Sequence, residues 1–410
     1  MKSFLWVVFL ALSGTSSMAQ RLCGTAEYQR MHPVLPILAE SRMGDDMSRD
    51  TVPNEVIIIP VVVHVLFNTE AQNISDAQVR SQLAVLNADF RRLNADTALT
   101  PAVFRGLAGD ARIMFCLSQV DPFGRPTKGI VRRYTTKPYF LGDDAMKYTA
   151  AGGDDAWDSR KYLNIWVCSL FGRSLGYATP PGGASDKDGV VINYDVFGTI
   201  GNLRSNFNKG RTATHEVAHW LGLKHIWGDE DCGNDEVDDT PTQQSSNYHC
   251  PVFPQRSTCS PNAYGDMFMN FMDFTDDACM NMFSRGQVKK MRSLFARNAL
   301  RNGFLNSFVC DSSLASGAPV PDDTLVVAKA PGTVTLYPNP AGPVCYLEAV
   351  GNYSLQHKTA SVYQSTGALV LRKVLTNDKE TLILRGLAPG VYLLSVGDGA
   401  DRRTLRFIRL

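Results

Sequence analysis

Apolar residues follow two different periods along this chain, and each period indicates one kind of structure. Residues 55–67 form an almost continuous β-branched run, which predicts a buried strand. Residues 76–93 repeat apolar side chains at helical spacing after Ser75, which can cap the first turn, and so predict a helix packed on the sheet. Further strands are expected at residues 113–117, 163–170 and 190–193, and a helix over residues 284–301. This part of the chain is expected to form an α/β (α+β) domain.

The last part of the chain has a different pattern of apolar and polar residues. Residues 334–410 alternate apolar and polar side chains in short runs separated by Gly, Pro and Asn, which is typical of a small all-β sandwich. The stretch before it, residues 306–333, is mostly poor in periodicity and rich in Ser, Ala, Pro and Asp, and is interpreted as a linker.

The N-terminus has the pattern of a secretory signal over residues 1–19, with Lys2, a short apolar run and the small-residue cleavage site before Gln20. The alternative is a buried N-terminal strand. Elsewhere no run approaches the ~18 apolar residues of a transmembrane helix, so no membrane-spanning segment is expected. Lys and Arg number 41 against 40 Asp and Glu, and this balance gives no reason to expect nucleic acid or an anionic membrane as a partner.

The strongest chemical signal is the pattern H-E-x-x-H-x-x-G-x-x-H, which begins at His215. Residues four apart share one face of a helix, so His215 and His219 can offer two imidazoles to one zinc ion, with Glu216 beside them as general base. Gly222 can turn the chain out of the helix and bring His225 back as third ligand. Three ligands leave one position open, as in catalytic zinc sites. The alternative, polar residues on a solvated helix, fits poorly with so long a pattern and its apolar neighbours.

A second motif makes a family resemblance explicit. Met272 lies in the segment Asn-Phe-Met-Asp-Phe over residues 270–274, where metzincin peptidases have a tight turn beneath the metal. Together with residues 232–241 and 276–283, these motifs resemble the pappalysin family, in particular its short bacterial branch of the ulilysin and mirolysin type. The resemblance covers roughly residues 56–301 and implies a metzincin, zincin-like catalytic domain whose cleft runs between an α/β half and a loop-rich half.

The resemblance also implies an activity. It predicts a zinc endopeptidase that acts on proteins or peptides and prefers arginine after the scissile bond. Asp276 and Asp277 could line the pocket for that arginine. Helix capping or surface solvation explains these two residues equally well. Relatives usually have tyrosine where this chain has Phe274, and a phenyl ring cannot donate a hydrogen bond to a developing oxyanion. The competing hypotheses are a catalytically weakened binding or adhesive protein on a peptidase scaffold, and a zinc amidase for small molecules.

Nine cysteines in an exported chain predict disulfides. The resemblance implies the pairs Cys232–Cys259 and Cys250–Cys279, although the sequence alone allows three pairings of these four. Cys116 and Cys168 lie in predicted strands, where a buried thiol is favoured over a bond.

Cys23 lies in residues 20–54, which are interpreted as a pro-segment. Its thiolate can fill the open zinc position and keep a zymogen latent. Pairing with another cysteine is the alternative.

Residues 231–240 are rich in acidic side chains, which repel one another unless a cation neutralises them. The resemblance implies structural calcium here, with Asp235, Asp238, Asp239 and Thr240 as ligands, and a solvated acidic face is the alternative.

The C-terminal domain resembles the sorting domain of the type IX secretion system, through Leu-Tyr-Pro-Asn-Pro at residues 336–340 and the basic end of the chain. This implies that the secretion machinery is a partner and that the protein is secreted or held at the outer cell surface. An adhesive or carbohydrate-binding sandwich is the alternative. The expected organisation is a signal at residues 1–19, a pro-segment at 20–54, a catalytic domain at 55–305, a linker at 306–333 and a sorting domain at 334–410.

Overall fold

The computed structural model describes residues 20–33, 54–259, 262–310, 333–350, 353–364, 368–397 and 402–410. The chain divides into two compact units. The first holds the chain up to residue 318 apart from residues 132–138, and the second holds those residues and the chain from residue 319 onward. The expected signal at residues 1–19, residues 34–53 of the expected pro-segment and residues 311–332 of the expected linker lie outside the described residues.

A mainly parallel sheet forms the centre of the first unit. Its strands run in the order β2 (Ile113–Leu117), β1 (Ile57–Phe67), β4 (Leu163–Cys168), β6 (Gly189–Asn193) and β5 (Gly176–Ala178), and β3 (Ile130–Tyr134) also belongs to it. The first four are mutually parallel, whereas β5 is antiparallel to β6 and lies at the end of this order. The β-branched run therefore forms the buried strand that its composition predicts, and every residue of β1 except Ile58 is buried.

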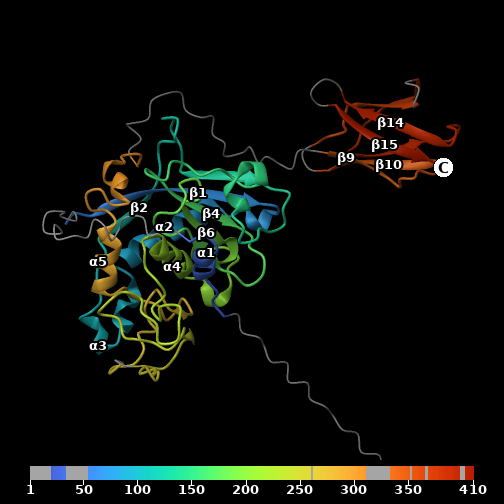
Figure 1. Ribbon diagram of the computed structural model, residues 1–410. Helices are drawn as coiled ribbons and strands as arrows, with labels where there is room; N and C mark the ends of the chain where they lie inside the picture. Colours follow the sequence, from blue (N-terminus) through green and yellow to red (C-terminus); the bar gives the residue numbers. More distant parts are fainter. Residues whose placement is uncertain are drawn as a thin grey trace, which may run out of the picture. The chain divides into compact units, whose positions relative to one another are not determined.

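Two helices, α2 (Asp76–Phe90) and α4 (Arg211–Trp220), lie side by side against this sheet (Figure 1). Ser75 caps α2 as the sequence predicts, because its side chain accepts a hydrogen bond from the Gln78 N–H at 3.1 Å. The other helices are α1 (Thr25–Met31), α3 (Ala102–Arg105) and α5 (Arg285–Ser293). Short 3-10 turns lie at η2 (Glu70–Gln72), η3 (Ala95–Leu99), η4 (Ala145–Lys147), η5 (Thr149–Ala151), η6 (Tyr194–Val196), η7 (Ser205–Phe207) and η8 (Asn302–Asn306).

Helix α5 is shorter than the sequence predicts. It begins as expected, where Ser284 and Gln287 form a reciprocal capping box. It ends at Ser293 and not near residue 301, and Asn298 has φ 62°, a left-handed conformation that an α-helix cannot contain. The residues after Ser293 form turns instead.

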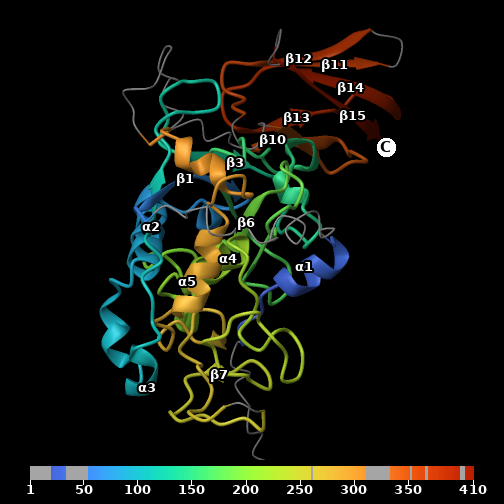
Figure 2. The same cartoon turned by 60° about the vertical axis from the view of Figure 1, so that its left-hand side comes forward.

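Between α4 and α5 the chain contains little regular structure, apart from β7 (Tyr248–His249) and β8 (Phe274–Thr275). Figure 2 shows these loops, in yellow, below α4 and around β7. The disulfides Cys232–Cys259 and Cys250–Cys279, with Cα–Cα distances of 5.6 Å each, cross-link this loop-rich part. They are the pairs that the resemblance implies.

The expectation of a free buried thiol holds for Cys168 and is wrong for Cys116. Cys116 is bonded to Cys310, which is 194 residues away in the sequence. Strand β2 is at one end of the sheet order, and Val309 returns beside the residues that follow it, where its carbonyl accepts from the Gln119 N–H at 2.7 Å. Sequence spacing alone gives no sign of this return.

The second unit is all antiparallel and has one hydrophobic core. One sheet has the order β13 (Lys379–Ile383), β10 (Val344–Val350) and β9 (Thr333–Tyr337). The other has the order β12 (Leu369–Val374), β11 (Thr359–Gln364), β14 (Gly390–Val396) and β15 (Arg403–Arg409). Core residues such as Leu347, Val362 and Leu394 come from both sheets, as the period of two predicts.

A buried ion pair links the residues after α5 to the sheet and to α4. The Arg301 guanidinium pairs with both carboxylate oxygens of Asp188 and stacks 3.9 Å from the Trp220 ring centroid, while the Trp220 indole N–H donates to Asp188 at 2.8 Å. We predict that Arg301→Ala lowers the free energy of unfolding by about 3–5 kcal/mol, because it leaves a buried carboxylate without its cation. Denaturant unfolding measures this loss.

Arg160→Ala is the matched control, because Arg160 pairs with Asp158 at 3.0 Å but its side chain is 82% exposed. Exposed pairs contribute at most about 1 kcal/mol, so this variant should unfold almost like the unaltered protein. An equal loss of unfolding free energy in the two variants would show that the buried pair stabilises the protein no more than the exposed one.

Candidate metal centre

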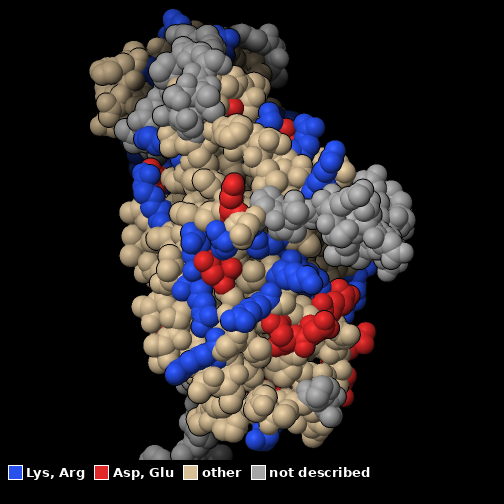
Figure 3. Space-filling view, turned by 90° about the vertical axis from the view of Figure 1, so that its left-hand side faces the viewer, with Lys and Arg blue, Asp and Glu red and all other residues tan. Residues whose placement is uncertain are grey.

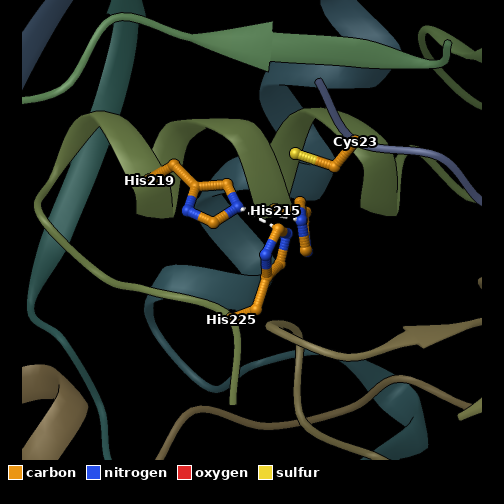
Figure 4. A group of neighbouring side chains, drawn as sticks. All are labelled: Cys23, His215, His219 and His225. Atoms are coloured by element: carbon orange, nitrogen blue, oxygen red, sulfur yellow. Dashed lines mark hydrogen bonds between the residues drawn. The ribbon is translucent and has the colours of Figure 1, made fainter. Parts of the chain in front are cut away.

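Helix α4 positions the first two histidines of the motif. Every residue of the helix is buried, and His215 and His219 lie one turn apart on the same face. The helix ends at Trp220, and Gly222 two residues later has a φ of 85°, which is accessible to glycine and strained for other residues. This turn brings His225 back beside the helix (Figure 4).

The three imidazoles converge through their Nε2 atoms. His219 Nε2 lies 3.1 Å from His215 Nε2 and 3.0 Å from His225 Nε2. Each Nδ1 faces an acceptor: Phe271 O at 2.6 Å for His215, Leu223 O at 2.8 Å for His219 and Asp229 Oδ1 at 2.5 Å for His225. An Nδ1–H donor leaves Nε2 with a free lone pair, so three lone pairs point at one place, as a metal ion requires.

The protonation states fit the same conclusion. Burial, followed by the charge of neighbouring imidazoles, holds the pKa of His215 well below its usual value and lowers the pKa of His219 to about 3. Neutral imidazoles are the form that binds a metal. The chemistry and placement of these residues therefore fit a zinc ion, which prefers nitrogen ligands of this kind.

Glu216 is buried beside the three histidines and does not belong to the converging group. Its Oε2 accepts hydrogen bonds from Thr25 Oγ1 at 2.9 Å and from Cys23 Sγ at 3.3 Å. Burial raises the pKa of Glu216 to about 7. Strand β5 makes room for this side chain with Gly176, where a β-carbon would lie 3.0 Å from the Glu216 Cγ.

Cys23 completes the cluster. Its sulfur and the histidine nitrogens all lie within 4.8 Å of one another, and Figure 4 shows the thiol directed at the histidines. The cysteine is in no disulfide, and burial raises the pKa of its thiol well above the usual value. Within the described residues, this is the one group of three or more metal-ligating side chains close enough to share an ion.

The turn with Met272 lies directly below the histidines. Met272 is fully buried, its N–H donates to Asn270 Oδ1 at 2.9 Å, and its carbonyl accepts from the Ile226 N–H at 3.2 Å. Phe274 packs its ring against His225, with centroids 4.8 Å apart, and against His215 at 5.8 Å. The aromatic ring is thus retained beside the metal ligands without the hydroxyl that relatives are expected to have.

Two acidic residues have clearer roles than the sequence indicates. Asp229 orients His225, and its spacing of four residues from that histidine is the sequence signal that could have identified it. Asp277 is fully buried and accepts from the backbone N–H groups of Lys209 and Arg211 as well as from the Arg21 guanidinium at 2.5 Å. It therefore holds the start of α4 and binds the side chain of Arg21 from the N-terminal segment. Asp276 lies 3.9 Å from His249 and is outside this arrangement.

The carboxylates of the acidic loop face different partners. Asp235 is buried and accepts from Thr240 Oγ1 at 2.9 Å, whereas Asp239 binds Ser284 Oγ at 2.6 Å and the Gly286 N–H at 2.8 Å, at the start of α5. Asp238 is exposed. Lys224 and Lys290 pair with Glu236 of the same loop. Figure 3 shows acidic and basic side chains adjoining on the side of the molecule where α5 lies in Figure 1. Among the described residues, Asp235, Asp238 and Asp239 thus do not form a group close enough to share an ion.

Comparison with known proteins agrees with this site. Residues 149–296 match the family model described as pregnancy-associated plasma protein-A, and residues 335–409 match that of a secretion system C-terminal sorting domain. An extracellular metalloprotease of Verticillium alfalfae is 31% identical over 303 residues, which are 71% of this chain and 96% of that protein.

Two solved structures are also similar. Mature mirolysin of Tannerella forsythia in complex with a cleaved peptide is 49% identical, with a TM-score of 0.62, over 65% of this chain and 100% of that chain. A mutant of Tannerella forsythia promirolysin is 46% identical, with a TM-score of 0.64, over 72% of this chain and 100% of that chain.

The fold and the histidine cluster define a metzincin-type metalloendopeptidase. Within that class, the chain belongs to the pappalysin family, the relatives of pregnancy-associated plasma protein-A, and it carries a C-terminal sorting domain of the type IX secretion system. The protein is accordingly secreted or located at the cell surface. Across the described residues, the structure has no helix with the length and apolar character needed to cross a membrane.

The contact between Asp229 and His225 generates a test of the metal centre. We predict that Asp229→Ala lowers zinc affinity by about 10–100-fold, because His225 loses the acceptor that fixes its tautomer and orientation. Competition with a chromogenic chelator measures the affinity. Glu230→Gln, at the exposed neighbouring position, should bind zinc like the unaltered protein. Equal affinities for the Asp229 variant and this control would show that His225 needs no such support.

Proposed function

We propose that the protein is a zinc endopeptidase in which Glu216 is the general base and the segment around Cys23 keeps the enzyme latent. The observation that carries the proposal is the position of Cys23, whose sulfur lies among the three histidines and 3.3 Å from Glu216 Oε2. A group in that place competes with both the metal-directed water and the base that would activate it.

His215, His219 and His225 would hold the ion. Zinc, when bound, supplies a Lewis acid that polarises the peptide carbonyl and makes water a better nucleophile. Glu216 takes the proton from the attacking water on a carboxylate oxygen and then delivers it to the nitrogen of the leaving amine. A pKa near neutrality suits a group that must both accept and return a proton. Phe274 provides no hydroxyl for the oxyanion, so this chain would lack one donor that relatives use.

Backbone contacts of the N-terminal segment just before α1 also support the latency proposal. The Leu22 carbonyl accepts from the Leu175 N–H at 2.9 Å, and the Gly24 N–H donates to the Gly176 carbonyl at 2.9 Å. The segment therefore adds to the edge of the sheet at β5, beside Glu216. Thr25 Oγ1 bonds to Glu216 at 2.9 Å and accepts from the Ala178 N–H at 2.9 Å. These contacts occupy the edge where an extended substrate could bind.

Arg21 supports a preference for arginine. Its side chain is buried, pairs with Asp277 at 2.5 Å, donates to the Thr275 carbonyl at 3.2 Å and lies 5.1 Å from the Phe207 ring centroid. A pocket that holds a guanidinium in this way suits a substrate arginine once the segment has left. The similarity to promirolysin, which extends over a larger share of this chain than the similarity to mature mirolysin, also favours a removable pro-segment.

The first test concerns the base. Glu216→Ala should abolish peptide hydrolysis while leaving one zinc bound, because Glu216 moves protons and is not a ligand. Hydrolysis of a denatured protein and metal analysis on the same sample separate the two properties. His219→Ala is the comparison, since it should lose metal and activity together. Loss of zinc in the Glu216 variant would reverse the role assigned here, and retained activity would favour a different base.

The second test concerns latency. Cys23→Ala in the full chain should shorten the lag before activity appears, because no thiol then competes for the open zinc position. Activity is followed in time while N-terminal sequencing dates the cuts, which we expect between about residues 42 and 56. Cys345→Ala is the matched control, because it removes another unpaired cysteine in the other unit. A lag equal to that of the control would show that the segment blocks the cleft by other groups.

The third test concerns calcium, which we retain as a proposal for the acidic loop. Its support is Asp235, whose pKa is raised to about 6 by burial. A cation bound to this carboxylate would replace the hydration that burial removes. Asp239 is already engaged with α5, so Asp235, Asp238 and Thr240 would be the principal ligands. A chelator too weak to strip zinc should lower the melting temperature, and millimolar calcium should restore it. An unchanged melting temperature would exclude the site.

A further inference from the structure

A second side chain of the N-terminal segment is buried beyond Cys23. Tyr28 of α1 is only 3% exposed, and its hydroxyl donates to Asp144 Oδ2 at 2.7 Å. Helix α1 packs beside β5 and places this phenol in a polar site.

The site around the phenol is built from buried groups of the catalytic unit. Asp144 also accepts from the Tyr177 hydroxyl at 2.9 Å and pairs with Lys147 Nζ at 2.9 Å. Lys147 Nζ lies 5.2 Å from the Tyr28 ring centroid, and the Tyr28 and Tyr177 rings are 5.0 Å apart. The side chains of Asp144 and Lys147 are 1% and 0% exposed. The site thus offers a carboxylate acceptor at its base, an ammonium group over the ring and an aromatic wall.

This arrangement lies next to the cleft. Tyr177 and Gly176 are neighbours on β5, and Gly176 is the residue that contacts Glu216 and the backbone of Gly24. Asp144 itself has φ 62°, an unusual conformation for a residue with a side chain, and it is held by two tyrosine hydroxyls and by Lys147 and Lys187. Removal of the N-terminal segment would take away Tyr28 and leave Asp144, Lys147 and Tyr177 in place.

We propose that Asp144, Lys147 and Tyr177 form a subsite that binds a tyrosine side chain of the peptide substrate, in the place that Tyr28 fills in the full chain. This inference rests on the proposed removal of the segment. Along the segment, Arg21 and Tyr28 lie on opposite sides of Cys23. In the proposed recognition, the place of Arg21 takes the substrate arginine that follows the scissile bond. The place of Tyr28, on the other side of Cys23, then takes a substrate residue that precedes the scissile bond.

The spacing can be bounded from chain geometry. Residues 25–28 are helical and advance about 4.5 Å along the helix axis, a distance that an extended peptide covers in about one to two residues. Thr25 is itself two positions beyond Cys23. The tyrosine of an extended substrate is therefore expected about three to four residues before the scissile bond.

The experiment uses the full chain after activation, once N-terminal sequencing shows that residues 20–33 are gone. Fluorogenic peptides with arginine after the scissile bond carry tyrosine, phenylalanine, O-methyltyrosine or alanine at each of the five preceding positions. At one of these positions, the tyrosine peptide should have a kcat/KM at least about tenfold higher than the phenylalanine and O-methyltyrosine peptides. A difference of about tenfold is the smallest effect expected from a hydrogen bond to a charged acceptor. The gain should come from KM, because the contact is remote from the reacting bond.

Asp144→Asn should remove most of this difference while cleavage of the alanine peptide continues. Tyr162→Phe is the control, because it removes a different buried hydroxyl, which bonds to the Val120 carbonyl at 3.0 Å. If the Asp144 variant does not fold, the comparison of tyrosine with O-methyltyrosine on the unaltered enzyme still decides.

Equal rates for tyrosine and phenylalanine at all five positions would overturn the subsite, and so would a tyrosine preference that survives Asp144→Asn. Either result would leave the zinc endopeptidase proposal intact. A chain that cleaves peptides while still carrying residues 20–33 would instead overturn the latency proposal, and the subsite with it.

Discussion

The site depends on the fixed orientation of three imidazoles. Each Nδ1 faces an acceptor from a different part of the chain: Phe271 from the turn with Met272, Leu223 from the exit of α4 and Asp229 from the loop beyond it. If any one of these acceptors moved, the corresponding Nε2 lone pair would no longer point at the shared position. The buried helix, the left-handed Gly222 and the cross-linked lower loops can all be understood as the means of holding these acceptors in place.

The N-terminal segment is complementary to the cleft along three contacts in a row. A guanidinium meets a buried carboxylate, a thiol meets the histidines and the base, and a phenol meets a second buried carboxylate. Two of these three contacts place a cationic or donor group on Asp277 or Asp144, and both acids are almost fully buried. Each acid would lose one donor with the segment and keep its other partners. Under the latency proposal, a substrate that supplies a similar donor takes the place of the segment at each acid.

The sequence predicted much of the fold because hydrophobic periodicity is local. Strand β1, helix α2 and the antiparallel C-terminal unit lie where the pattern placed them. Helix α5 ends at Ser293, and the left-handed Asn298 excludes one continuous helix to residue 301; residue type alone does not reveal that conformation. Cys116 was assigned a free thiol wrongly, since its partner arrives from 194 residues away. The expected calcium ligands came from the acidic cluster and from the family resemblance, whereas their geometry depends on what else each carboxylate contacts.

By itself, the sequence predicted the cluster of His215, His219 and His225 with Glu216 beside it, and an α/β part followed by an all-β C-terminal part, because the spacing of a helical motif and the period of strands are properties of neighbouring residues. The tertiary structure decided which acceptor orients each imidazole, that Arg21 reaches Asp277, and that Tyr28 reaches Asp144. The last two contacts join residues 256 and 116 positions apart. Long-range contacts of this kind arise only when the sheet edge and the loops fold together, and no local pattern encodes them.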